Sequence, residues 1–379
     1  NKFFYDVIYN PRETIFLKKA KLFGNKTENG KMMFIYQAHQ SFTIWHKKMP
    51  KIGDETIKSW IQSGAFTPLH SLNLGWNMIS DIGAKALASA ASVNQLKQLF
   101  LNSNYIRDEG SIAIANSPHL GALEYFYFYD NKFSRKTEVA LSDFRIRTLL
   151  NKSLSKDKKS LNLNGKSLGD KGLAALARSE VLTSIEKLSL RNNNISCRGI
   201  IALAESKNLN GLKSLNLMSN KIGDLGIAAL AESPFLESLE KLNLEGTKIS
   251  SLGILAIAQS KTLTNLRSLN VTRNDLMEKG IKHLASSKNF SSLKSLWIAD
   301  VFMGDIGVQA LAKSENLSNL EELLANGNLI TNKGLLSIAS SENLKSLKHL
   351  DLRRNNLKIE GFFSLSDSTK IKNLEKFRF

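Results

Sequence analysis

Leucine recurs along the chain at a fixed spacing, in the frame L-x-x-L-x-L-x-x-N-x-I/L. LHSLNLGWNMI from Leu69, LKSLNLMSNKI from Leu212 and LKHLDLRRNNL from Leu347 all follow this frame. Its first position falls at Leu69, Leu96, Leu123, Lys158, Ile185, Leu212, Leu239, Leu266, Leu293, Leu320, Leu347 and Leu374. Every step is 27 residues, except for the 35-residue step after Leu123. Such a constant period predicts structural repeats that stack into a solenoid.

The second half of each repeat predicts a helix. In DLGIAALAESPFL from Asp224, aliphatic residues fall three and four positions apart, and Ser, Gly or Asp precedes them where helix amides need a cap. A glycine recurs in this half, and we expect it to let the helix pack closely on the strand: Gly83, Gly110, Gly172, Gly199, Gly226, Gly253, Gly280, Gly307, Gly334 and Gly361. Each repeat therefore predicts one short strand, a turn, one helix and a return loop. Stacked repeats of this kind give an α/β solenoid with a parallel sheet.

The stretch NKIGDLGIAALAES, from Asn220 to Ser233, resembles the consensus of helix-containing leucine-rich repeats of the ribonuclease-inhibitor-like and cysteine-containing subclasses. The resemblance covers roughly Phe42 to Phe379. Asn220 and Ser233 stand where the second subclass has Cys, so the subclass stays open. The resemblance implies a curved horseshoe that binds macromolecules on its concave face and rarely catalyses a reaction. The Asn, Lys and Ser enrichment is similar to that of bacterial effector proteins delivered into eukaryotic cells.

Three segments depart from the frame. Residues 1–41 do not fit it, and we expect an N-terminal cap with strands around Asn29 and Gly30, or else a separate docking module. The repeat 123–157 is eight residues longer than the others, so the region after Phe144 is expected to extend a helix and then cross as a basic loop. The last strand, NLEKFRF, has no helix after it; either the natural chain continues, or Phe377 and Phe379 close the last apolar layer. Since the sequence begins without Met, we expect it to be a fragment.

The segment LEYFYFYDNKF, from Leu123 to Phe133, places aromatics where other repeats have Asn or Ser. Alternation along a strand predicts that Phe126 and Phe128 point into the core. The remaining rings are expected on the concave side, with two contributed by the preceding strands: Tyr125, Tyr127, Tyr129, Phe100 and Trp76. Because neighbouring strands lie roughly 5 Å apart, these rings predict one contiguous partner-binding surface. Two alternatives are that residues 1–41 or the inserted loop cover it, or that it makes a homotypic contact.

A second candidate surface lies near the end of the chain. Trp297 and Leu324 are expected on the same concave side, followed by Asp351, Arg353, Arg354 and Arg378. Trp297 is a candidate anchor, and the arginines are candidates for pairing with carboxylates or phosphate. The alternative is a solvated end of the solenoid.

The net charge of +18 raises nucleic acid and anionic membrane as partners. Lysines such as Lys207 and Lys313 are nevertheless scattered and mixed with acids such as Glu205 and Glu315, so nucleic acid is not the expected partner. We find no apolar run of the ~18 residues that a membrane span needs. Cys197 is the only cysteine, so no disulfide forms within the chain, and a structural role is expected for it.

Catalytic patterns are missing from the sequence. The six histidines are dispersed, without metal-ligand spacing, and neither a G-x-S-x-G elbow nor a nucleotide-binding loop occurs. His349 and Asp351 share one strand, but no nucleophile accompanies them. We expect no cofactor and no metal. The sequence favours a monomeric, non-catalytic scaffold that binds a host protein, as a secreted bacterial effector acting in host cytoplasm; otherwise the protein is cytoplasmic. The alternatives are an electrostatic adaptor for nucleic acid or anionic membrane, and a targeting module for an enzyme domain outside this chain.

Overall fold

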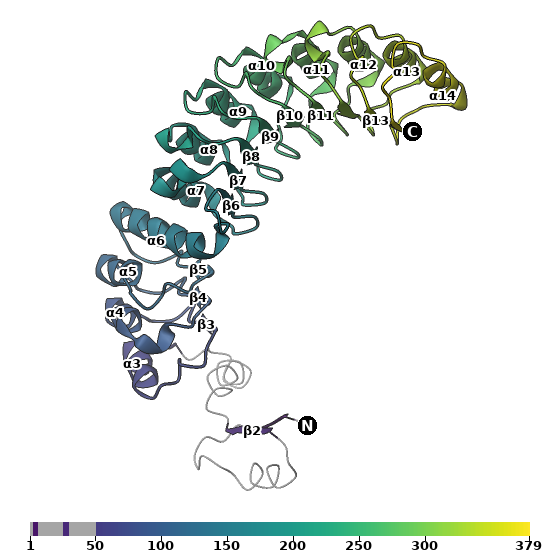
Figure 1. Cartoon of the computed structure of the whole chain (residues 1–379). Coiled ribbons are helices and arrows are strands. Elements are labelled where there is room, and N and C mark those ends of the chain that lie inside the picture. Colours follow the sequence, from purple (N-terminus) through teal and green to yellow (C-terminus); the bar gives the residue numbers. More distant parts are fainter. Residues whose placement is uncertain (1–2, 7–25, 30–50) are drawn as a thin grey trace. The chain divides into compact units, whose positions relative to one another are not determined.

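The computed structural model describes residues 3–6, 26–29 and 51–379 (Figure 1). The chain divides into two compact units, unit 1 (Asn1–Thr148) and unit 2 (Leu149–Phe379), which are described separately. In each unit the helices lie on one side of a parallel sheet (Figure 1). The face of the sheet that points away from the helices is called the sheet face below.

Unit 1 contains a parallel sheet in the order β3-β4-β5. Its strands are β3 (Ser71–Asn73), β4 (Gln98–Phe100) and β5 (Tyr125–Tyr127). Its helices are α3 (Asp54–Gln62), α4 (Asp81–Ser89), α5 (Asp108–Ala115) and the beginning of α6 (Arg135–Ser153), with a 3-10 turn at Ala91–Val93. A separate parallel pair, β1 (Phe3–Asp6) and β2 (Lys26–Asn29), falls inside the predicted cap. The rest of that cap lies outside the described residues, so its role stays a prediction.

Unit 2 contains a longer parallel sheet in which β6 to β14 pair in sequence order. The strands are β6 (Ser160–Asn162), β7 (Lys187–Ser189), β8 (Ser214–Asn216), β9 (Lys241–Asn243), β10 (Ser268–Asn270), β11 (Ser295–Trp297), β12 (Glu322–Leu324), β13 (His349–Asp351) and β14 (Lys376–Arg378). The helices are α7 (Gly169–Arg178), α8 (Cys197–Ala204), α9 (Gly223–Glu232), α10 (Ser251–Gln259), α11 (Met277–Ser286), α12 (Gly304–Ala312), α13 (Asn332–Ala339) and α14 (Ile359–Ser366). Several return loops contain 3-10 turns, at Glu180–Ser184, Lys207–Leu209, Lys288–Phe290 and Glu315–Leu317. The predicted strand-helix solenoid with its parallel sheet is confirmed.

The leucines of the frame form the core between sheet and helices. Leu239, Leu242 and Leu244 of one repeat are each no more than 2% exposed, and their counterparts in the other repeats are buried in the same way. Paired strands are in register at equivalent positions, as where Leu242 lies opposite Leu215 and Leu269. A single repeat cannot cover both of its apolar faces, so this core exists only because repeats stack.

Where the frame has asparagine, as at Asn220, the side chain joins its repeat to the preceding one. Asn220 is 1% exposed, and its amide donates to the carbonyls of Leu190 and Leu217, each at 2.9 Å. Its Oδ1 accepts from the backbone N–H groups of Asn193 at 3.0 Å and Ile195 at 3.1 Å. This one side chain therefore satisfies buried backbone groups of two repeats at the turn that follows β8.

The recurrent glycine has a different role from the predicted one at several positions. A Cβ on Gly253 would lie 2.7 Å from Asp224 Oδ1 of the preceding repeat, which accepts from the N–H of Gly253 at 2.9 Å. The same carboxylate accepts from the N–H of Ser250 at 2.8 Å and from its hydroxyl at 2.7 Å. Gly83 and Gly334 meet the carboxylates of Asp54 and Asp305 in the same way. At these positions the missing side chain admits an acid that caps the next helix, rather than bringing the helix onto its own strand.

The long repeat extends its helix, as predicted. Helix α6 has 19 residues, whereas the other helices from α3 to α14 have 8 to 10. Thr137 occupies the glycine slot near its start and is 2% exposed. The sheet of unit 1 ends at β5, and another sheet begins at β6 after this helix.

At the other end of unit 2, the last strand packs against the last helix through aromatic rings. Phe362 of α14 stacks with Phe377 at 6.1 Å and with Phe379 at 5.3 Å between ring centroids. Phe379 is still 49% exposed, so closure of an apolar layer by these phenylalanines stays a prediction. Among the described residues, no helix is both long and apolar enough to cross a membrane.

Candidate functional site

A stacked aromatic pair lies on the sheet face of unit 1. Phe100 of β4 and Tyr127 of β5 are opposite one another in the register, and their rings are 5.0 Å apart and inclined by 2°. Both side chains are half-buried. Beneath them Phe126 is 6% exposed and packs edge-on against Phe144 at 5.5 Å, while Phe128 is 7% exposed. The predicted separation into inward phenylalanines and outward rings is confirmed for these residues.

Tyr129 and Trp76 lie beyond the strands, in the turns that follow them. Tyr129 comes two residues after β5 and is 59% exposed, whereas Trp76 comes three residues after β3 and is 68% exposed. Trp76 also has a left-handed backbone, with φ of 63°, and its N–H donates to the carbonyl of Asn102 at 2.9 Å. The expectation that Trp76 projects from a strand is therefore wrong. Tyr125 opens β5 and is half-buried, opposite Gln98.

The exposed rings continue onto the turn that leads to the helices, which sequence reasoning missed. Met78 and Tyr105, at the same frame position in neighbouring repeats, are 50% and 44% exposed. Lys132, at that position in the next repeat, places its ammonium 5.4 Å from the centre of the Tyr105 ring, a cation–π contact. Tyr105 and Lys132 border a cavity of about 410 Å³, whose other lining residues are Ser80, Asp81, Ile82, Lys85, Arg107 and Glu109. The sequence signal for this exposed group was a large residue directly after the asparagine of the frame, as at Met78 and Tyr105.

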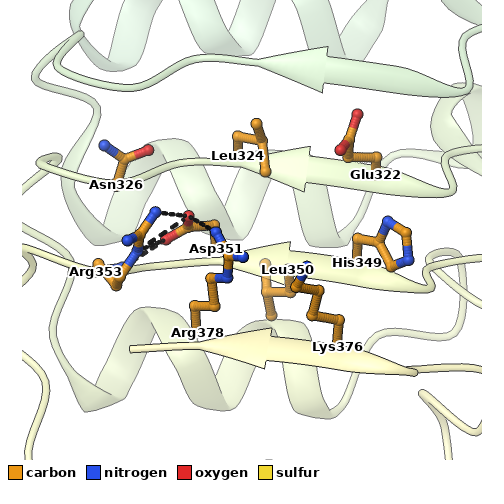
Figure 2. A pocket seen from close by; sticks show the side chains of 9 residues that line it. All are labelled: Glu322, Leu324, Asn326, His349, Leu350, Asp351, Arg353, Lys376 and Arg378. Carbon is orange, nitrogen blue, oxygen red and sulfur yellow. Dashed lines mark hydrogen bonds and ion pairs between the residues drawn. The ribbon is translucent and has the colours of Figure 1, made fainter.

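The second candidate surface lies on the sheet face of unit 2 (Figure 2). Trp297 is 38% exposed, and its indole N–H donates to Glu322 Oε2 at 2.9 Å. In the register, Trp297, Leu324, Asp351 and Arg378 lie on successive strands. A cavity of about 250 Å³ is bordered by four of the residues predicted for this surface, Leu324, Asp351, Arg353 and Arg378. Trp297 and Arg354 are not among its lining residues.

Arg353 already forms an ion pair with Asp351, two residues before it in the chain. Its Nε donates to Asp351 Oδ1 at 3.0 Å, and its Nη2 donates to Oδ2 at 2.6 Å (Figure 2). Asp351 is 5% exposed, and burial alone would raise the pKa of its carboxyl. Hydrogen bonds from Arg353 and the nearby charge of Arg378 outweigh burial, so the pKa of Asp351 lies below its usual value.

Arg354 is also paired within the chain. Its Nη2 donates to both carboxylate oxygens of Asp300, at 3.1 and 2.9 Å, although Asp300 lies two repeats earlier. The arginines expected to pair with a partner's carboxylate or phosphate, Arg353 and Arg354, therefore hold acids of this chain. Arg378 is less committed, since its contact with Asp351 is 3.9 Å long and its side chain is 47% exposed.

Lysines and glutamates alternate along the edge of the unit 2 sheet where its strands begin. Glu321 bridges Lys294 at 2.8 Å and Lys348 at 2.9 Å, and Glu186 joins Lys159 and Lys213 in the same manner. The hydrogen bonds and charges of its two lysines lower the pKa of Glu321 to about 2. Several lysines of the sheet edge are thus paired with acids, which does not favour a continuous basic stripe for nucleic acid.

The remaining candidates for chemistry in the described part of the chain are possible metal ligands, the cysteine and the histidines. No group of three or more His, Cys, Asp or Glu side chains there is placed to hold a metal ion. Cys197 is the first residue of α8, after the capping Ser196, in the slot where other repeats have Asp. His349 Nε2 lies 3.9 Å from Glu375 on the sheet face.

Comparison with known proteins agrees with the repeat architecture. A model of the leucine-rich-repeat family matches residues 67–88, 181–204, 210–231, 236–258, 262–285 and 343–366. These segments coincide with the strand-helix repeats described above. The chain is a leucine-rich-repeat protein.

Solved structures that are similar to this chain include two bacterial internalins. An internalin from Listeria monocytogenes is 22% identical, with a TM-score of 0.37, covering 86% of this chain and 94% of the other. Internalin C2 from the same species is 23% identical, with a TM-score of 0.34, covering 52% of this chain and 81% of the other.

A short stretch of the leucine-rich-repeat protein is similar to an enzyme. Over 57 residues, 15% of this chain, it is 67% identical to the NADP⁺-dependent shikimate dehydrogenase of Pelagibacter ubique, covering 22% of that enzyme. The corresponding enzyme of Methanococcus aeolicus is 55% identical over 47 residues, covering 17% of its length. The chain thus spans about a fifth of the length of these curated relatives.

Proposed function

We propose that this leucine-rich-repeat protein is a non-catalytic scaffold that binds a partner protein through the aromatic residues of unit 1. The stacked pair of Phe100 and Tyr127 on the sheet face carries the proposal. Tyr129 and Trp76 extend it with two strongly exposed rings. Core packing does not require rings at the positions of Phe100 and Tyr127, since other repeats have Asn there, for example Asn216 and Asn243.

The physical advantage of this surface is that it is formed before the partner arrives. Phe100 and Tyr127 lie on hydrogen-bonded strands, so binding orders little additional backbone. Aromatic side chains supply large contact areas with few rotatable bonds, and Tyr and Trp are enriched among the residues that dominate interface energy. The neighbouring Asn and Ser side chains provide a polar rim.

The finer part of the proposal concerns the partner and the compartment. The Asn, Lys and Ser enrichment supports a secreted bacterial effector that acts on a host protein in host cytoplasm, as a monomer. The internal pairing of Arg353 and Arg354 makes the electrostatic adaptor for nucleic acid or anionic membrane the less favoured alternative.

Affinity capture from nuclease-treated eukaryotic lysate tests this function. The native chain is compared with a Tyr127→Ser, Trp76→Ser variant and with a control, Leu225→Ser, which removes a 75% exposed side chain of α9. Circular dichroism first establishes that all three chains fold alike. We expect one protein to be captured by the native chain and the control, and to be lost with the aromatic variant. Identical captures by all three chains would contradict the proposal.

The likeness to shikimate dehydrogenase favours a second candidate, in which the repeats target an enzyme. The matched stretch covers only 22% of the dehydrogenase, so this chain is not proposed to act as that enzyme alone. The test is the rate of NADPH formation from shikimate and NADP⁺ by the longest natural protein that contains this chain. Activity in that protein would support a targeting role for the repeats, and its absence would leave the scaffold role alone.

A further inference from the structure

The sheet face of β11 to β14 carries a graded row of side chains. The first and third residues of each strand point to this face. Because the strands are in register, residues at the same position of neighbouring strands lie side by side. The row formed by third residues is Trp297, Leu324, Asp351 and Arg378, and the row formed by first residues ends with Glu322, His349 and Lys376. Figure 2 shows Arg378 and Lys376 rising from β14 toward Asp351 and Leu350. The third residues of the strands thus change from apolar at β11 and β12 to cationic at β14.

Both carboxylates that line the cavity already have donors. Glu322 accepts from the indole of Trp297 at 2.9 Å and from the hydroxyl of Ser295. Asp351 accepts from the guanidinium of Arg353 along both of its oxygens. Neither acid therefore needs an additional cation.

Two cations of β14 keep capacity for another anion. Arg378 reaches Asp351 only at 3.9 Å and is about half exposed. Lys376 is exposed and lines the same cavity. With Arg353 included, three cationic side chains and two carboxylates line the cavity, so it has an excess of positive charge. One additional carboxylate would balance it with charge-assisted hydrogen bonds.

The apolar end of the row lies at a defined separation from these cations. Leu324 is two strands from Arg378, roughly 10 Å, and Trp297 is three strands away, roughly 14 Å. An extended peptide advances about 3.3 Å per residue. A peptide crossing the strands would thus place an apolar residue on Leu324 or Trp297 about three or four residues from an acid on Arg378.

We propose that the sheet face of β11 to β14 binds an extended segment of a partner protein in which an apolar side chain and a carboxylate lie three or four residues apart. The proposal rests on the proposed function, since it supplies a second contact, in unit 2, for a protein partner. Arg378 and Lys376 receive the carboxylate, while Trp297 and Leu324 receive the apolar side chain. A nucleic-acid backbone is the less suitable occupant, because Glu322 and Asp351 lie in the same cavity and repel a polyanion.

An array of synthetic nine-residue peptides tests the proposal. Each peptide contains one leucine and one glutamate in a serine and threonine background, at spacings from one to six residues, and a second set replaces glutamate by glutamine. Binding of the native chain is compared with that of Lys376→Gln, Arg378→Gln. The matched control, Lys313→Gln, Lys333→Gln, removes the same charge at helix ends of α12 and α13.

The native chain and the control are expected to bind best at spacings of three and four. Binding should fall about tenfold with the β14 variant and also with the glutamine peptides, as expected for loss of a hydrogen-bonded charge pair. Thermal unfolding checks that the β14 variant folds like the control.

Several outcomes would overturn the proposal: no binding by any peptide, equal binding at all spacings, or equal binding by the β14 variant. Displacement of every peptide by millimolar inorganic phosphate, whatever its leucine position, would also overturn it in favour of a simple anion site. These results concern unit 2 only. Capture that depends on Tyr127 and Trp76 would then still support the proposed function, so the two failures are distinguishable.

Discussion

The two sheet faces of this protein follow one backbone plan but differ in chemistry. In unit 1, Phe100 and Tyr127 stack on β4 and β5, whereas the same positions on β8 and β9 hold Asn216 and Asn243. The buried positions beneath them do not differ in kind: Leu99 and Leu242 are both almost fully buried. The comparison teaches that the fold constrains the inward positions, while the sheet-face positions are free to carry function.

Truncating an inward ring should have the largest effect on stability. Phe126→Ala removes a 6% exposed ring that packs on Phe128 and Phe144, and should lower the free energy of unfolding by about 3–5 kcal/mol. Leu225→Ala, at a 75% exposed position, should change it by less than about 0.5 kcal/mol. Chemical denaturation measures both values. Similar values for the two variants would break the rule that inward positions are set by packing.

Removing one rung of the asparagine ladder should have the next largest effect. Asn220→Ala leaves the buried N–H groups of Asn193 and Ile195 and the carbonyls of Leu190 and Leu217 without this partner. We expect a loss of about 2–4 kcal/mol in the free energy of unfolding. Asn210→Ala, at an exposed position after a 3-10 turn, is the control and should cost less than about 0.5 kcal/mol. A small loss for Asn220→Ala would show that water replaces the amide.

An exposed apolar residue in a strained turn of unit 2 sharpens the comparison. Leu329 is 58% exposed with φ of 61°, and the same frame position holds Asn194 with φ of 54°. Asn tolerates this left-handed backbone better than Leu, so Leu329→Asn should raise the free energy of unfolding by about 0.5–1 kcal/mol. Phe302, 59% exposed with φ of 58°, is the corresponding residue of the preceding repeat. A destabilised Leu329→Asn variant would mean that the leucine is held by packing, and not retained as an exposed surface residue.

Acid should weaken the ion pairs that Glu321 makes beside the unit 2 strands. Two lysines depress the pKa of Glu321 to about 2, below its usual 4.5. The pair contributes stability that is fully present above pH 4.5 and is lost as the pH falls through about 2. Across that window the native chain should lose more stability than Glu321→Gln, by a small amount because the pairs are solvent-exposed. Thermal unfolding midpoints at several pH values test this, and parallel pH profiles would contradict it.

The sequence predicted most of the features that depend on the repeat itself. A period of 27 residues located the strands, the helices and the inward Leu and Phe positions, because burial alternates along a strand and recurs along a helix. The inward Phe126 and Phe128 followed from that frame, and the departure from it predicted the extension of a helix after Phe144.

The features that the sequence did not predict arise from contacts between repeats. Arg354 pairs with Asp300, 54 residues earlier, and the N–H of Gly253 donates to Asp224, 29 residues earlier. The residue spacing within one repeat therefore predicts neither contact. Trp76 was misplaced because β3 ends at Asn73 and the chain turns with a positive φ at Trp76, where alternation no longer applies.

The most direct test of the protein-binding account is the salt dependence of affinity for the captured partner. Affinity is measured for the native chain and for Tyr127→Ser, Trp76→Ser at about 0.05 M and about 0.5 M salt, which changes electrostatic screening strongly. The account predicts that salt changes the native affinity by less than about threefold, whereas the aromatic variant binds at least about tenfold more weakly at both concentrations. A steep loss with salt and equal affinity for the two chains would contradict it, and would assign binding to the basic surface instead.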